Sequence, residues 1–190
     1  MFAGLSAGCR DLRASADDYY DRQNLYDIRI QSTLGLTNAD VKAVSQLKDV
    51  EKACGTYSET ALVQAGDLQQ KAEVTLLDMK GFNQPLLLEG TLPQSASEIA
   101  VSQNYCTDAG KKIGDQVTLT AQRTSGDEDT SALKQHSYTI TAIVQDAADL
   151  IADDGAASFR SSQSAKYFFY VTSDALDNEV YSAIELSVRG

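Results

Sequence analysis

Short segments with an apolar residue at every second position constrain the fold of this chain more than any other feature. In "HSYTITAIVQ", the residues Tyr138, Ile140, Ala142 and Val144 recur with this period. A period of two places these side chains on one face of a β-strand. Comparable patterns predict strands at about 25–32, from 50 onward as one long strand or a bent pair, and at 72–78, 98–102, 116–122, 167–173 and 181–190. The chain must therefore build sheets.

Helical patterns are fewer and shorter. Thr37 is a good N-cap, Asp40 stands where a capping-box acid lies, and Val41, Val44 and Leu47 form one apolar stripe behind them. A second short helix is expected in "QNYCTDAG", closed by Gly110, and residues 10–24 are compatible with a third. We therefore predict an α+β fold: a small mixed sheet with helices, plus a second, mainly β subdomain.

Composition excludes several functional classes. The 190 residues include 43% hydrophobic side chains, enough for a packed core, and carry a net charge of -11. Binding to nucleic acid or to an anionic membrane requires concentrated Lys and Arg, so neither is expected. Cys9, Cys54 and Cys106 are far apart, which favours buried apolar cysteines over a disulfide framework, although one bridge would be compatible with the count.

Signs of catalysis are absent from the sequence. His136 is the single histidine and no GxSxG motif accompanies it, so a solvated imidazole at the end of a loop is favoured over a hydrolase triad. We expect no catalytic residue and no enzymatic activity.

Cofactor and metal motifs are absent as well. The acidic runs "DDYYD", "GDEDT" and "DAADLIADDG" lack the spacing of a calcium-binding loop, and the chain has neither GxGxxG nor GxxxxGK[ST]. We expect no cofactor and no metal site.

The order of elements resembles one known family. The resemblance rests on three stretches: "YDIRIQSTLGLTNADVKAVSQLKDVEKACGTY", "LLLEGTLPQSASEIAVSQNYCTDAGKKIGDQVTLTA" and "HSYTITAIVQD". They are similar to the MacB-like periplasmic core domain of FtsX-like ABC-transporter permeases, most closely to permeases of Gram-positive bacteria. Ala142 departs from the family, in which glycine is common at that position. The likeness covers residues 25–190 except the loops 123–135 and 146–166.

The resemblance implies an organisation in two subdomains. Residues 25–85 and 166–190 would form a discontinuous α+β subdomain, into which a β-rich subdomain of residues 86–165 is inserted. Residues 1–24 would form a helical segment after a transmembrane helix that ends just before residue 2, so we expect the chain to be a domain cut from a longer protein. A helix and strand usually follow the family's last segment, and without them an edge strand would be free to pair with another copy of the chain.

The resemblance also implies a function. The chain would be a non-catalytic extracytoplasmic domain of a permease in the cell membrane, extracellular in a Gram-positive organism. Its partners would be the transmembrane helices of the permease and a separate cytoplasmic ATPase subunit, whose cycle the domain relays. The alternative is a binding module that captures a peptide, lipid or lipoprotein in a cleft between the subdomains, with Tyr167, Phe168, Phe169 and Tyr170 as candidate lining residues.

Candidate site residues follow from these two hypotheses. The expected crossings between subdomains are Leu88–Pro93 and Lys166–Val171. Only alternate rings of "YFFY" would face a cleft if this segment is a strand, so half of them are expected in the core. The cleft or hinge residues that we predict are Leu88, Glu89, Gly90, Pro93, Tyr167 and Phe169.

Overall fold

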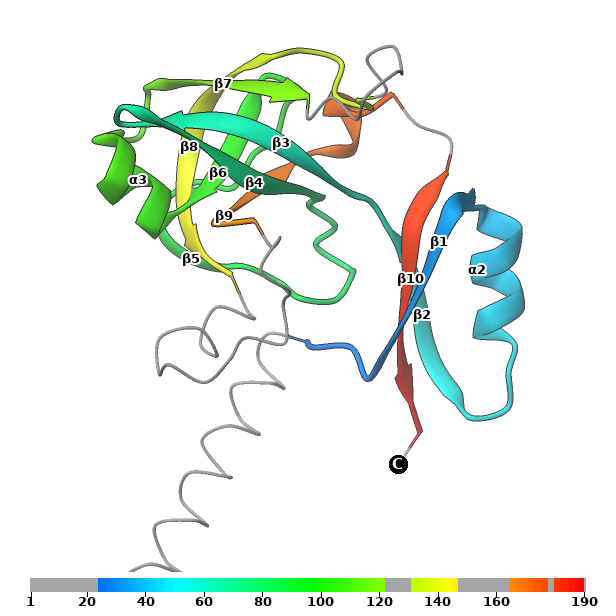
Figure 1. Ribbon diagram of the computed structural model, residues 1–190. Coiled ribbons are helices and arrows are strands. Elements are labelled where there is room, and N and C mark those ends of the chain that lie inside the picture. The colour runs from blue at the N-terminus through cyan, green and yellow to red at the C-terminus, as the bar shows by residue number, and fades with distance from the viewer. Residues whose placement is uncertain (1–23, 122–130, 147–164, 178–179, 190) are drawn as a thin grey trace, which may run out of the picture.

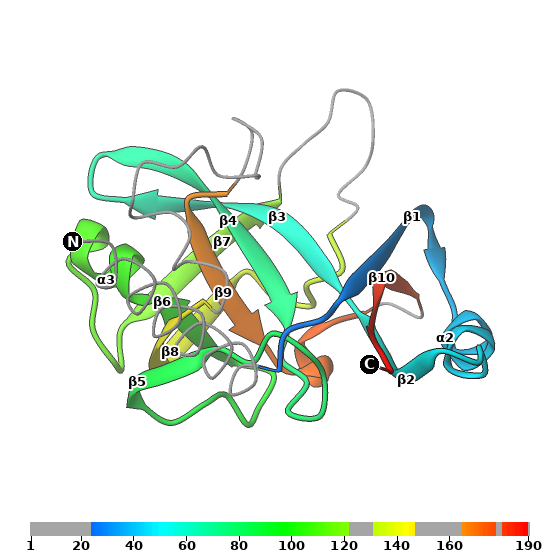
Figure 2. The same ribbon diagram turned by 90° about the horizontal axis from the view of Figure 1, so that it is seen from below.

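The computed structural model describes residues 24–121, 131–146, 165–177 and 180–189. The expected helix at 10–24 therefore lies outside the described residues, except for Asn24. The described chain forms two β-sheets that lie side by side (Figures 1 and 2).

The smaller sheet has three antiparallel strands in the order β1-β10-β2. Their bounds are β1 Ile28–Leu36, β2 Val50–Thr56 and β10 Tyr181–Val188, and α2 spans Asn38–Ser45. The predicted capping box of α2 is confirmed: Asp40 N donates to Thr37 Oγ1, and Asp40 Oδ2 accepts from Thr37 N at 2.7 Å. The helix lies on the side of this sheet away from the larger one, where it contacts β2 (Figure 2).

The larger sheet has seven strands in the order β5-β8-β6-β9-β4-β3-β7. Their bounds are β3 Ser58–Ala65, β4 Leu68–Leu76, β5 Leu86–Gly90, β6 Glu98–Ser102, β7 Gln116–Ala121, β8 Ser137–Gln145 and β9 Tyr167–Val171. Strand β7 also pairs with the start of β8, through Ser137–Thr139, and this pairing closes the sheet into a barrel. Helix α3 (Gln103–Ala109) ends as predicted at Gly110, which is left-handed with φ +63°. A 3-10 turn, η2 (Ser173–Ala175), follows β9.

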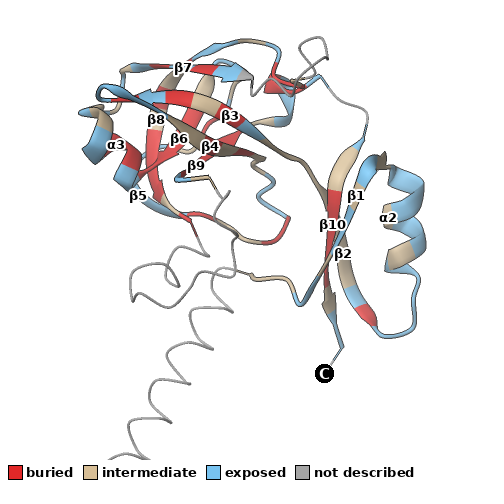
Figure 3. Ribbon diagram, viewed as in Figure 1, coloured by how far each residue is buried: buried red, intermediate tan, exposed pale blue. Residues whose placement is uncertain are grey.

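The main hydrophobic core lies inside the barrel, and buried residues are concentrated there (Figure 3). Its largest fully buried side chains include Tyr105, Tyr138, Tyr167, Phe169 and Ile140. Tyr138 and Ile140 are two of the residues whose period of two predicted this strand. Burial in the smaller sheet is concentrated in its central strand, at Ala183, Ile184, Glu185 and Leu186.

The two sheets do not divide the chain at the expected residues. Strands β3, β4 and β9 were expected beside β1 and β10, but they are hydrogen-bonded within the barrel sheet. The long apolar segment after Val50 breaks at Tyr57, where the backbone passes from β2 to β3. All five residues of β9 are buried, which requires a central strand, and β9 lies between β4 and β6. Strand β4 also begins earlier than the predicted strand at 72–78, because Leu68–Lys71 already belong to it.

Candidate functional site: the cleft between the two sheets

A cavity of about 80 Å³ lies where the two sheets meet. Strands β1, β2 and β10 line it on one side, and β4, β9 and the loop after β4 line it on the other. Its polar lining includes Arg29, Glu73, Asn83, Asp146, Tyr170 and Glu185.

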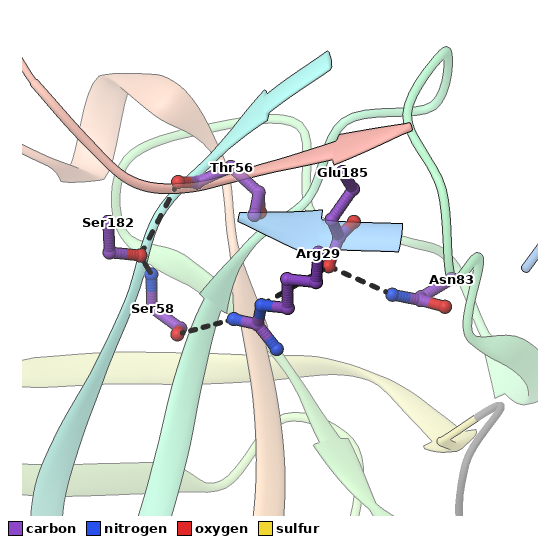
Figure 4. A network of polar contacts seen from close by, with 6 residues as sticks. All are labelled: Arg29, Thr56, Ser58, Asn83, Ser182 and Glu185. Atoms are coloured by element: carbon purple, nitrogen blue, oxygen red, sulfur yellow. Dashed lines mark hydrogen bonds and ion pairs between the residues drawn. The ribbon is translucent and has the colours of Figure 1, made fainter. Parts of the chain in front are cut away.

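Arg29 and Glu185 form the centre of a polar network at this junction (Figure 4). Arg29 Nε lies 3.7 Å from Glu185 Oε1, and Arg29 Nη2 donates to Ser58 Oγ of the barrel at 3.4 Å. The same Glu185 oxygen accepts from Asn83 Nδ2 at 3.1 Å. The network therefore joins β1 and β10 of the smaller sheet to β3 and to the loop after β4.

A second part of the network lies beside Tyr57, where the chain passes between the sheets. Ser58 N donates to Ser182 Oγ at 2.9 Å, and Ser182 Oγ donates to the Thr56 carbonyl at 3.4 Å (Figure 4). Leu76 N also donates to the Tyr57 carbonyl at 2.9 Å. These bonds hold β10 against the bend between β2 and β3.

Glu185 is a charged group in an unusually buried place, since only 5% of the residue is exposed. Burial raises the pKa of the Glu185 carboxyl, and the nearby Glu73 raises it further, whereas Arg29 and the hydrogen bond from Asn83 oppose the rise. A buried carboxylate with only one basic neighbour is costly to ionise. How readily Glu185 binds a proton therefore depends on how close Arg29 and the Asn83 amide lie to its carboxyl group.

Strand β9 contributes aromatic rings to two different environments. Tyr167 and Phe169 point into the barrel core and make edge-to-face contacts with Tyr105, at ring-centroid distances of 5.2 and 4.9 Å. Phe168 and Tyr170 line the cavity, and Tyr170 Oη donates to the buried carboxylate of Asp146 at 2.6 Å. The alternation expected for "YFFY" is present, but Tyr167 and Phe169, which we predicted at the cleft, belong to the core.

The other predicted site residues lie on or after β5, away from this cavity. Leu88 and Glu89 are exposed on that strand, and Pro93 is buried after it. Gly90 is left-handed, with φ +84°, and lies directly against the Thr141 carbonyl of β8. None of these four residues lines the cavity.

Sequence reasoning missed Arg29, Asn83 and Glu185. A signal was present for two of them, because Arg29 lies between Ile28 and Ile30 and Glu185 lies between Ile184 and Leu186 at strand positions. A charged residue within an apolar strand requires a partner when that strand is buried. Asn83 stands in a loop without a recognisable motif.

In the described part of the chain, no group of three or more His, Cys, Asp or Glu side chains could hold a metal ion. His136 is exposed and immediately precedes β8. Cys54 and Cys106 are free thiols, and Cys9 lies outside the described residues.

Within the described residues, no helix is long and apolar enough to cross a membrane.

No protein-family model and no curated protein matches this sequence. The extracellular domain of the noncanonical ABC-type transporter YknZ from Gram-positive bacteria has a TM-score of 0.49 at 9% identity, over 87% of this chain and 82% of that one. The periplasmic region of MacB from Actinobacillus actinomycetemcomitans has a TM-score of 0.45 at 12% identity, over 84% of this chain and 66% of that one. The chain is thus similar to an extracellular domain of an ABC-type transporter and to the periplasmic region of MacB.

Proposed function

We propose that this chain is a non-catalytic extracytoplasmic domain of an ABC-transporter permease and that it relays conformational change through movement of its two sheets. The ordered sequence motifs that resemble the MacB-like core domain support the assignment. The observation that carries the relay is the junction between the sheets, where Arg29, Asn83 and Glu185 make polar contacts from one sheet side to the other and no buried residue of the smaller sheet belongs to a hydrophobic cluster of the barrel.

The buried apolar residues of the two sheets are separate. Val50, Ile184 and Leu186 are buried in the smaller sheet, yet they belong to neither of the hydrophobic clusters of the barrel. Apolar contacts are non-directional and numerous, and a shared core would hold the sheets in one arrangement. The described contacts across the junction include hydrogen bonds, the Arg29–Glu185 ion pair and a cation–π contact of Lys52 with Phe82, so a modest change in position breaks few of them.

The covalent connections also suit a hinge. Tyr57 alone separates β2 of the smaller sheet from β3 of the barrel, and η2 precedes the return to β10. Hinge movement needs only a few residues at the ends of elements to absorb the change in backbone angles. We assign the hinge to Tyr57, in place of the crossing predicted at Leu88–Pro93.

The size of the cavity favours the relay over capture of a ligand. Pockets for drug-sized ligands usually enclose roughly 300–1,000 Å³ and are mostly apolar. The cavity here has about 80 Å³, and carboxylates, amides and a guanidinium lie in its wall. A peptide or lipid acyl chain would therefore need a different arrangement of the two sheets.

The location of the domain is tested in intact cells that express the full-length permease. Leu34 is 94% exposed, so the new thiol of a Leu34→Cys variant would react with a membrane-impermeant maleimide. We expect labelling before lysis, and we expect a separate ATPase subunit to copurify. Labelling that requires permeabilised cells would contradict the extracytoplasmic assignment.

The relay is tested by locking the sheets together. Lys80→Cys places a thiol beside Cys54, whose Sγ lies 4.0 Å from the Lys80 carbonyl, and the resulting disulfide would join the barrel to β2. We expect oxidation to abolish transport-coupled ATPase activity of the assembled permease, and reduction to restore it. Met79→Cys, one residue away and 63% exposed, is the matched control. Full activity of Lys80→Cys after complete crosslinking to Cys54 would refute the relay.

A further inference from the structure

The loop between β4 and β5, residues 77–85, belongs to the barrel sheet but makes close contacts with the smaller sheet and the segment leading into it. Asn24 Nδ2 donates to the Gly81 carbonyl at 2.6 Å, and Asn83 N donates to the Asn24 carbonyl at 3.0 Å. The Asn83 side chain adds the hydrogen bond to Glu185. These three contacts hold the loop to residues just before β1 and in β10.

Strand β2 contacts the same loop through Lys52. Lys52 Nζ lies 3.4 Å from the Gly81 carbonyl and 4.7 Å from the centroid of the Phe82 ring. Phe82 is only 8% exposed, but it belongs to neither hydrophobic cluster of the barrel. Phe82, the most buried large apolar side chain of the loop, thus contacts the other sheet through a cation–π interaction.

The loop keeps its own shape through internal hydrogen bonds. Gly81 N and Gln84 Nε2 both donate to the Asp78 carbonyl, at 2.8 and 2.6 Å. Lys80 N donates to Asp78 Oδ1 at 2.9 Å. Because these bonds lie within the loop, it can leave the smaller sheet without losing its turn.

We infer that residues 77–85 form a latch that closes the cleft between the sheets and fixes their relative position. Seven residues of the loop line the cavity, so its release opens the cavity to solvent. The inference rests on the proposed movement of the sheets and identifies the contact that controls it. Asn83 is its centre, because its backbone and its side chain bind two different segments of the smaller-sheet side.

Cys54 provides a direct readout of the latch. It lies on β2 opposite Glu185, lines the cavity and contacts the loop at Lys80. An open latch would expose its thiol to a small alkylating reagent. Cys106 is buried in the barrel core and reports unfolding of the barrel in the same experiment.

Two substitutions at Asn83 separate the latch from general loosening. Asn83 has φ +52°, a conformation that Asp and Gly also tolerate. Asn83→Asp replaces the amide donor by a carboxylate that faces Glu185, whereas Asn83→Gly only removes the side chain. On the purified 190-residue chain at neutral pH, we expect Cys54 to be alkylated about tenfold faster in Asn83→Asp than in the wild type, with a smaller rise in Asn83→Gly.

Peptide mapping by mass spectrometry would follow Cys54 and Cys106 separately. Unchanged Cys54 labelling in Asn83→Asp would refute the latch, and so would a parallel rise at Cys106, since that pattern means unfolding of the barrel. Labelling of Cys54 alone supports the latch even if the domain were found in another cellular compartment. The test thus distinguishes failure of the latch from failure of the proposed function.

Discussion

Asn83 donates its side-chain amide to Glu185 Oε1 at 3.1 Å, although the first residue belongs to a barrel loop and the second to the central strand of the other sheet. This contact joins a loop with a tight internal turn to a carboxylate that is 5% exposed. A hydrogen bond to an ionised, buried group is among the stronger polar contacts in proteins. It makes the closed arrangement of the sheets sensitive to the charge of Glu185.

Glu185→Gln should change how stability depends on pH. Because burial raises the pKa of Glu185 above the usual value of 4.5, the folded chain binds this proton more tightly than the unfolded chain does. The stability that the proton contributes is present below pH 4.5 and is lost as pH rises through the higher, folded-state pKa. Glutamine is neutral throughout, so we expect the difference in Tm, variant minus wild type, to increase from about pH 4 to about pH 7.

The exposed Glu51 on β2 offers the control for this measurement. Glu51→Gln should follow the wild-type pH profile of Tm in the same buffers. A Glu185→Gln profile parallel to that of the wild type would show that the carboxylate is not the source of the dependence.

Gly90→Ala should destabilise the barrel severely. Gly90 has φ +84°, and a Cβ there would overlap the Thr141 carbonyl and approach Ile113 Cδ1 to 2.6 Å. Backbone strain and the clash with main-chain atoms together should cost about 3 kcal/mol or more. Urea unfolding followed by circular dichroism would measure this loss.

Gly110→Ala is the matched control, because Gly110 is also left-handed, at φ +63°, but has open space around it. Only the strain of the backbone applies there, about 1–2 kcal/mol. Equal losses of unfolding free energy in the two variants would mean that the clash with the Thr141 carbonyl adds nothing to the cost of backbone strain at Gly90.

Phe169→Ala tests the assignment of this ring to the barrel core. Phe169 has no exposed surface, and its ring centroid lies 4.9 Å from that of Tyr105. Its truncation should therefore lower the free energy of unfolding, measured by chemical denaturation, by about 3–5 kcal/mol. Leu87→Ala removes a side chain that is 42% exposed, and should change the free energy of unfolding by about 0.5 kcal/mol or less. A small effect at Phe169 would place the ring in a looser environment than the core.

Sequence patterns predicted the local elements well, because each depends on nearby residues. The period of two located β8, and Thr37 with Asp40 located the start of α2. Gly110 ended α3 in the expected conformation. In each case the signal and the structure that it determines lie close together in the sequence.

Assignment of strands to sheets could not be derived in this way. The parallel pairing of β9 with β4 joins residues that are far apart in the sequence, such as Ala72 and Tyr167. A period of two defines the two faces of β9 but does not decide which face meets which core, so Phe169 was expected at the cleft. The Arg29–Glu185 pair was missed for the same reason, since its two strands come from opposite ends of the chain.

Thr37→Ala should loosen α2 without affecting the barrel. The helix has eight residues and none of them is buried, so its capping box supplies an unusually large part of its stability. Loss of a threonine cap costs about 1 kcal/mol, and we expect amide exchange in α2 to accelerate about fivefold. Thr33→Ala, at an exposed position on β1, should leave this exchange unchanged. Because no hydrophobic cluster of the described residues spans both sheets, exchange in β6, β8 and β9 should remain at wild-type rates in both variants. Faster exchange in those barrel strands would mean that the two sheets unfold as one cooperative unit, which would contradict independent movement of the smaller sheet.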